Sequence, residues 1–236
     1  MPLSFLTILF VLLSAVLSVS AQQVQHVTKF IDFGVSTNAF KGDLSHSYTD
    51  WANAVHIGLK FNKKKRINGH FNLMVGNAFA QNPDYRFDNG ITPQPSPATF
   101  VKISLITVHY EAQLNLYKNK NWAFYLYQGI GICRFDPRDS ENKKLSDQLN
   151  TRAQGESYSN VTIALPNGIG ASYLFTNGFA VGFQAGWLNT NTDYLDNTSK
   201  WGDRAGNDNI LSYKMSVFLP LKKLIPEPPL PLPSLE

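Results

Sequence analysis

The sequence predicts an all-β fold: an eight-stranded antiparallel transmembrane β-barrel of the outer membrane, with a plugged lumen, short periplasmic turns and longer outer loops. Three observations predict it. Apolar and polar residues alternate along most of the chain, most clearly from Ile163 to Phe183, and a period of two is that of a β-strand. Segments of this kind recur along the chain, and short turns alternate with longer connections between them. A segment typical of a secretory signal precedes them.

Residues 1–21 have the features of a signal peptide. An apolar run from Phe5 to Val19 is too short to span a bilayer comfortably, and it ends in small residues. We expect cleavage near Ala21, which leaves residues 22–219 as the barrel domain. No later segment has enough consecutive apolar residues for a transmembrane helix. Cys133 is the only cysteine, so closure of the sheet must stabilise this exported domain without an internal disulfide.

The first four strands are expected near residues 29–38, 53–61, 69–79 and 101–117. The first three each have one apolar face, which includes Phe33, Ile57 and Leu73. In the fourth, the apolar phase changes between Leu105 and Ile106, and we expect a β-bulge or a later strand start at this point.

The last four strands are expected near residues 122–135, 160–175, 179–187 and 209–219. Short turns are expected at 62–68, 118–121 and 176–178, and longer connections at 39–52, 80–99, 136–157 and 188–208. Both ends of the barrel domain then lie on the short-turn side. Outer-membrane barrels have this asymmetry, with short periplasmic turns and longer outer loops.

The direction of the apolar face decides between two kinds of barrel. A secreted lipocalin-type barrel has the same alternation, with its apolar face inward. Three features favour an apolar face toward lipid: a charged opposite face, many glycines on that face, as a narrow lumen requires, and aromatic residues near the strand ends. A mean hydropathy of −0.18 agrees with such a wall, because alternating faces average out. The polar face carries Asp32, His56, Lys60, His70, His109, Glu111, Gln113, Gln184 and Lys214.

Four charged residues of the polar face form a predicted lumen charge network: Asp32, Lys60, Glu111 and Lys214. We expect the two acids to pair with the two lysines inside the barrel. Asp32 and Lys214 lie on the first and last strands, which must meet at closure, so we expect them to be neighbours. Pairing that only neutralises buried charge is favoured over a role in transport or catalysis.

The sequence contains none of the common catalytic or phosphate-binding motifs, so we expect neither enzymatic activity nor a cofactor. The alternative is a lipid-modifying barrel with a Ser/His/Asp set at its rim, because such sets are defined by geometry and not by spacing. The acidic connection with Asp193, Asp196, Asp203 and Asp208 has the oxygen ligands that calcium uses, but a solvated loop is the favoured interpretation.

Basic residues concentrate on the short-turn side, and two interpretations are open. They contact anionic lipid and keep the rim solvated, or they form a docking surface for a periplasmic partner. Residues 220–236 form a proline-rich periplasmic tail, which is either a linear docking peptide or a disordered end. No nucleic-acid partner is expected. The basic residues of this side are Lys63, Lys64, Lys65, Arg66, Lys118, Lys120, Lys222 and Lys223, eight of 21 in the chain.

Several stretches, taken in order over residues 30–219, carry a family resemblance. A strand has a central Tyr110-Glu111, Gly129-Ile-Gly131 precedes Asp136-Pro137, and Pro166 precedes the pair Gly168 and Gly170. The last connection contains Asp193-Tyr-Leu-Asp196 and Arg204-Ala-Gly206-Asn207. Together they resemble the PorG-like outer-membrane proteins of the type IX secretion system. Gln184 stands where the family pattern has a glutamate.

The resemblance implies a non-enzymatic barrel in the outer membrane of a gram-negative bacterium. It implies that the barrel anchors periplasmic subunits of a secretion complex, including a ring lipoprotein. A stand-alone structural or adhesion barrel that acts through its outer loops is the alternative, because a shared fold does not fix a function.

Overall fold

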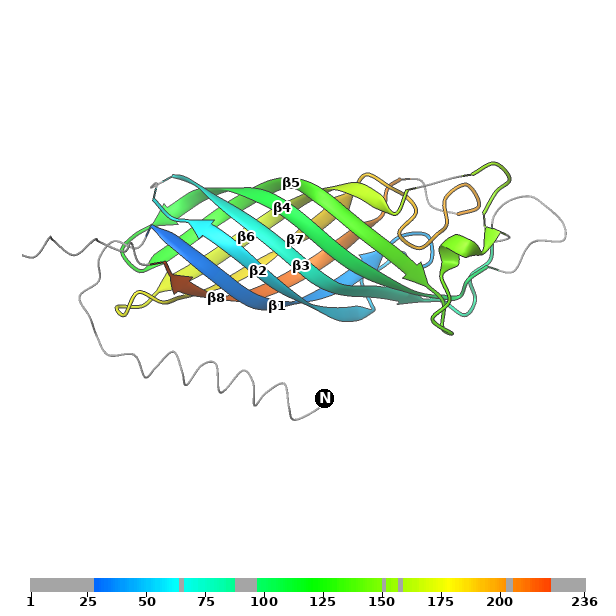
Figure 1. The fold of residues 1–236 in the computed structure, drawn as a ribbon, viewed down its shortest axis with the longest axis horizontal. Helices are drawn as coiled ribbons and strands as arrows, with labels where there is room; N and C mark the ends of the chain where they lie inside the picture. The colour runs from blue at the N-terminus through cyan, green and yellow to red at the C-terminus, as the bar shows by residue number, and fades with distance from the viewer. Residues whose placement is uncertain are drawn as a thin grey trace, which may run out of the picture.

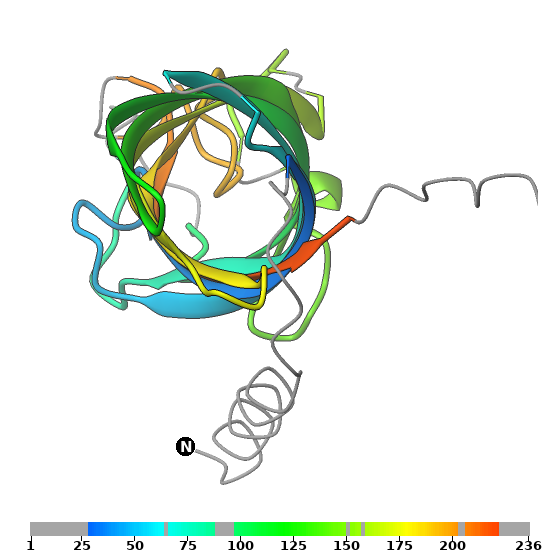
Figure 2. The ribbon, with the colours of Figure 1, turned by 90° about the vertical axis from the view of Figure 1, so that its left-hand side faces the viewer.

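The chain folds into a closed barrel of antiparallel strands (Figure 1). The computed structural model describes residues 28–63, 66–87, 97–149, 152–156, 159–202 and 206–221. Each strand pairs with the next one in sequence, and β1 closes the ring against β8, as seen down the barrel in Figure 2. The predicted fold of eight antiparallel strands is therefore confirmed.

The strands are longer than the sequence pattern predicted, except β6, which is one residue shorter at each end. Their bounds are β1 Lys29–Lys41, β2 Trp51–Phe61, β3 Ile67–Gln81, β4 Phe100–Lys118, β5 Trp122–Arg138, β6 Val161–Leu174, β7 Ala180–Thr190 and β8 Asn209–Pro220. A short 3₁₀ turn, η1, covers Leu145–Asp147. Within the described ranges, no helix has the length and apolar character needed to cross a membrane.

The two ends of the barrel differ (Figure 1). The short-turn end carries the turns 62–66, 119–121 and 175–179, together with the start of β1 and the end of β8. The long-loop end carries the connections 42–50, 82–99, 139–160 and 191–208. β4 has 19 residues. A tilted strand of that length spans about 45 Å, whereas the hydrocarbon core is about 30 Å thick. The barrel wall is therefore taller than the hydrocarbon core of a bilayer.

The apolar face of the wall points outward. Val55 and Ile130, for example, are 60% and 62% exposed, although both lie within strands. The charged and amide side chains of the opposite face are buried inside the barrel, with exposures of 0–6%. This arrangement is the reverse of a lipocalin-type barrel, so that alternative is wrong.

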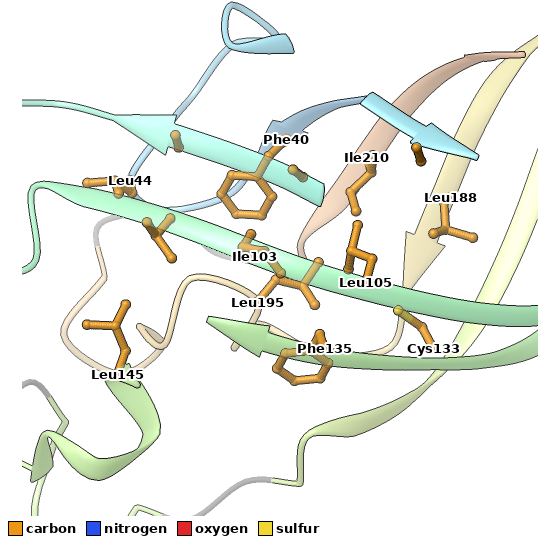
Figure 3. Close-up of a cluster of buried hydrophobic side chains, with 14 of the residues drawn as sticks. Phe40, Leu44, Ile103, Leu105, Cys133, Phe135, Leu145, Leu188, Leu195 and Ile210 are labelled. Carbon is orange, nitrogen blue, oxygen red and sulfur yellow. The ribbon is translucent and has the colours of Figure 1, made fainter. Parts of the chain in front are cut away.

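The lumen is filled by two layers of side chains. The apolar layer, shown in Figure 3, lies toward the long-loop end and includes Phe40, Met74, Ile103, Leu105, Phe135, Leu188 and Ile210. Loop residues Leu44, Leu145 and Leu195 pack onto it. The polar layer lies between the apolar layer and the short-turn end. It consists of the inward residues Asp32, His56, Lys60, His70, His109, Glu111, Gln113, Gln184 and Lys214.

The irregularity expected in β4 at Leu105 and Ile106 is not present. Burial alternates there without interruption: Ile103 and Leu105 point into the apolar layer, and Ile106 points outward. The change of phase in the sequence marks the level at which the lumen changes from apolar to polar. The shift in pairing with β5 occurs lower in the strand, between Asn115 and Tyr117.

Candidate functional site

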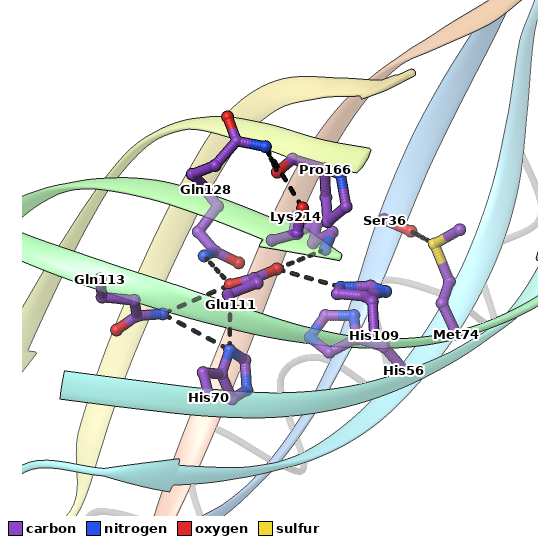
Figure 4. Close-up of polar contacts among 12 residues, drawn as sticks. Ser36, His56, His70, Met74, His109, Glu111, Gln113, Gln128, Pro166 and Lys214 are labelled. Carbon is purple, nitrogen blue, oxygen red and sulfur yellow. Dashed lines mark hydrogen bonds and ion pairs between the residues drawn. The ribbon is translucent and has the colours of Figure 1, made fainter. Parts of the chain in front are cut away.

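Glu111, in β4, is the centre of the polar layer (Figure 4). Its Oε1 lies 3.1 Å from His109 Nε2 and 3.4 Å from Lys214 Nζ. Its Oε2 accepts a hydrogen bond of 2.9 Å from Gln184 and lies 3.2 Å from His70 Nδ1. The carboxylate is fully buried, so these contacts replace its hydration.

His70 joins Glu111 to the second buried acid of the layer. Its Nε2 lies 2.9 Å from Asp32 Oδ1, while its Nδ1 faces Glu111. An imidazole donates from both nitrogens only when it is protonated. A protonated His70 together with Lys214 balances the two carboxylates, and the resulting chain of contacts links β1, β3, β4 and β8.

Two of the predicted lumen partners, Asp32 and Lys214, do not pair with each other. They lie on adjacent strands, but Asp32 is opposite Phe218 and Lys214 is opposite Ser36. The four-residue offset separates them by about 13 Å along the sheet. Lys214 turns instead to Glu111, from the opposite side of the lumen.

Lys60 contacts aromatic rings and not the acids. Its Nζ lies 4.4 Å from the ring centroid of Tyr125 and 4.8 Å from that of Phe218. It has no hydrogen-bond partner among the described residues, although the side chain is buried. Cation–π contacts are therefore the main direct stabilisation of this ammonium.

Ser216, His56 and Asp32 meet inside the barrel without the geometry of a catalytic triad. His56 Nε2 lies 2.9 Å from Ser216 Oγ and 3.6 Å from Asp32 Oδ2. In a triad the nucleophile and the acid use opposite nitrogens of the imidazole. Here both face Nε2, and His56 Nδ1 is buried without a partner among the described residues.

Glycine 58 makes the close approach of Asp32 and His70 possible. A Cβ atom at this position would lie 2.2 Å from Asp32 Oδ1 and 2.5 Å from His70 Nε2. The sequence placed the histidines on the polar face but did not indicate their pairing, because pairing depends on strand register. The one local signal was the glycine at position 58 on the polar face, which lies opposite Asp32 once β1 and β2 are paired.

The basic rim is defined here by Lys63, Lys64, Lys65, Arg66, Lys118 and Lys120. Lys118 Nζ donates to Asn62 Oδ1 at 2.7 Å, which ties two turns together. Lys63, Arg66 and Lys120 are exposed, and none forms an ion pair with a described acid. Lys64 and Lys65, with the tail from residue 222 and the signal peptide, lie outside the described residues.

Two acids of the outer connection, Asp196 and Asp208, are buried, contrary to the solvated loop that was expected. Asp196 is 2% exposed, and its carboxylate accepts hydrogen bonds from the backbone N–H of Leu44 at 3.0 Å and of Thr198 at 3.1 Å. Burial, and secondarily the nearby Asp43 carboxylate, raise the pKa of Asp196 to about 7. Burial also raises the pKa of Asp208. In the part of the chain that the structure describes, no set of three or more His, Cys, Asp or Glu residues is placed to hold a metal ion.

Several solved structures are similar to this chain. Neisserial surface protein A aligns with 82% of this chain and 97% of its own, at 11% identity and a TM-score of 0.50. Ail, the attachment invasion locus protein of Yersinia pestis, in complex with the heparin analogue sucrose octasulfate, aligns with 82% of this chain and 98% of its own. Its identity is 10% and its TM-score 0.45. The outer membrane enzyme PagL aligns with 80% of this chain and 99% of its own, at 16% identity and a TM-score of 0.37.

Sequence comparison identifies the family. No curated protein sequence matches this chain. The family model described as outer membrane protein beta-barrel domain matches residues 9–213, which is most of the chain. The outward apolar wall and the closed eight-stranded sheet agree with this match. The chain therefore belongs to the outer membrane protein β-barrel family.

Proposed function

We propose that this barrel is a non-enzymatic scaffold that anchors a periplasmic protein complex, of the type IX secretion kind, to the outer membrane. The observation that carries the proposal is the basic rim at the short-turn end. Lys63, Arg66 and Lys120 project from this rim without described ion pairs, so their charge is available to a partner. The family pattern of short periplasmic turns directs this end toward the periplasm.

Two features of the rim support docking. Lys118 links the turns 62–66 and 119–121 through Asn62, and the backbone N–H of Asn115 donates to Arg66 O at 2.7 Å. The basic groups are therefore held on a common framework, which reduces the entropy lost on binding. The filled lumen also favours a scaffold over a channel, because the polar layer has most of its charges paired across the barrel.

The test is a pull-down of periplasmic subunits from envelope extracts. The test variant reverses the charge of Lys63, Lys64, Lys65 and Arg66 to Glu. The matched control reverses Arg86, Lys143, Lys144 and Lys200, which are exposed at the long-loop end. We expect wild type and control to recover the same periplasmic complex, and the rim variant to lose it. Equal recovery by both variants would remove the basic rim as the docking surface.

A structural or adhesion role through the outer loops is the second candidate. The observation that favours it is the packing of Leu44, Leu145 and Leu195 onto the apolar layer, which gives the loop end a defined surface. Ail is named for attachment. Binding of whole cells to host surface polysaccharide that depends on the long-loop residues and not on the rim would favour this role.

A lipid-modifying enzyme is the third candidate. The arrangement of the buried serine, histidine and aspartate gives it the least support. Ser216 and Asp32 face the same nitrogen of His56, and all three are buried. A lipase and acyltransferase assay in detergent tests it, with Ser216→Ala as the variant.

A further inference from the structure

The mouth of the barrel at the short-turn end holds a small positive cavity of about 40 Å³. Its lining includes Lys60, Lys118 and Lys120, together with Phe30, Trp122 and Phe218. The described lining contains no Asp or Glu. The cavity is therefore enclosed by three cations and aromatic walls, and it lies inside the ring of the basic rim.

Lys60 is the unusual group of this cavity. Its side chain is 6% exposed, and its Nζ has no hydrogen-bond partner among the described residues. The rings of Tyr125 and Phe218 stabilise the cation but leave its N–H donors unused. The buried acids Asp32 and Glu111 lie farther from the short-turn end. Their carboxylates already contact histidines, Gln184 and Lys214. The ammonium thus needs acceptors that the described chain does not provide.

The size of the cavity limits the acceptor. A water molecule needs roughly 10–15 Å³ of such volume, so the cavity has room for about three atoms of that size. A carboxylate group has three heavy atoms. A sugar or a lipid chain is far larger, and lipid approaches the barrel from its outer wall, whereas this cavity opens within the turns.

We propose that this cavity binds one carboxylate from an acidic segment of a periplasmic protein, and that Lys60 is its charged contact. This site adds a specific contact to the proposed scaffold function, and the identity of the partner as a periplasmic protein rests on that proposed function. The rim attracts the acidic segment at longer range, and the mouth accepts a single side chain or carboxyl terminus. Charge-assisted hydrogen bonds of this kind are short and strong in a partly buried setting.

The test uses the full-length barrel in detergent and a fluorescent hexaglutamate peptide, with hexaglutamine as the uncharged control. Fluorescence anisotropy measures binding to wild type, Lys60→Met, Lys60→Arg and the rim control Lys63→Met. We expect Lys60→Met to bind about tenfold more weakly or worse, as for the loss of one charge-assisted hydrogen bond. Lys60→Arg should retain binding, and Lys63→Met should change it less than about threefold because exposed charges are screened.

A zero-length carbodiimide coupling locates the bound carboxylate. The reagent joins a carboxylate to an amine in contact with it, and mass spectrometry then identifies the lysine in the amide. We expect an adduct at Lys60. Adducts only at the exposed lysines, or unchanged binding by Lys60→Met, overturn the proposal. A competition experiment gives a further outcome that overturns the proposal. If inorganic phosphate displaces the labelled peptide at the same concentration as unlabelled peptide does, the cavity is a site for free anions.

The outcomes separate this inference from the scaffold role. Unchanged peptide binding by Lys60→Met, together with loss of the periplasmic complex by the rim variant, removes the mouth site and keeps the scaffold. Weakened peptide binding by Lys60→Met, together with retained pull-down by the rim variant, removes the rim as the docking surface and keeps the mouth site. Heat-modifiable migration on a gel checks that each variant is a folded barrel.

Discussion

Replacement of Glu111 by leucine should destabilise the barrel strongly. The carboxylate is fully buried and has three contacts of 2.9–3.2 Å, to Gln184, His109 and His70. A hydrogen bond to a charged group contributes about 1.5–3 kcal/mol, but such contributions are not additive within a network. Removal of one partner of a buried ion pair costs about 3–5 kcal/mol, because the other charge is left unpaired. We expect a loss of about this size.

The double variant Glu111→Leu/Lys214→Met isolates the cause. It removes the lysine that Glu111 contacts at 3.4 Å, so the free energy of unfolding should recover by about 2 kcal/mol or more relative to Glu111→Leu. Asn72→Leu is the matched control, since it removes a neutral buried side chain whose amide has no hydrogen-bond partner among the described residues, and it should cost about 1 kcal/mol or less.

Urea unfolding in lipid vesicles measures these changes. Trp51, Trp122 and Trp187 lie exposed on the outer wall, so their fluorescence changes when the wall leaves the lipid. If the double variant is as unstable as the sum of its single variants, the unpaired Lys214 charge is not the source of the loss. The explanation of the polar layer by charge balance would then be refuted.

Three further predictions concern other parts of the barrel. Gly58→Ala should destabilise it by about 1–3 kcal/mol in the same urea assay, since the added methyl overlaps Asp32 and His70; no loss would contradict the close packing. Val108→Arg, on the outward face, should cost about 2–4 kcal/mol in vesicles, and a smaller cost would place this residue outside the hydrocarbon. The pKa of Asp196 is raised to about 7 in the fold, against about 3.9 unfolded, so between these values the folded state alone keeps the proton. Protection of the Thr198 amide from hydrogen exchange should therefore fall as pH rises from 4 to 7, and less steeply in Asp196→Asn; a rise in protection would contradict this sign.

The strand pattern could be predicted because alternation is a local property of the sequence. Phe33, Ile57 and Leu73 were placed on the outward face from their spacing alone, and all three point outward. The same rule misled at Leu105 and Ile106. Toward the long-loop end of β4, Ile103 and Leu105 face the apolar layer while Lys102 and Ser104 face outward; from Ile106 onward the apolar residues face outward instead. The apolar phase therefore changes sides, and the sequence pattern then looks like a bulge.

The contacts of the lumen could not be predicted in detail, because they depend on closure and register. Lys214 pairs with Glu111 across the barrel, and Asp32 pairs with His70 two strands away. A sequence shows which residues point inward but not the height at which each one sits. Lys60 was expected to pair with an acid because both point inward. At its level along the barrel axis, however, its neighbours are aromatic rings.

The two layers have a consequence for how neighbouring strands find their alignment during assembly. A slip of one residue in the pairing of β4 along its outer part would move Lys102 and Ser104 from the outer surface into the apolar layer. Along the inner part, the same slip would push Glu111 and His109 into hydrocarbon, where unpaired polar groups are very unfavourable. Both halves of β4 therefore oppose a shifted alignment, the outer half because its lumen is apolar and the inner half because its lumen is polar.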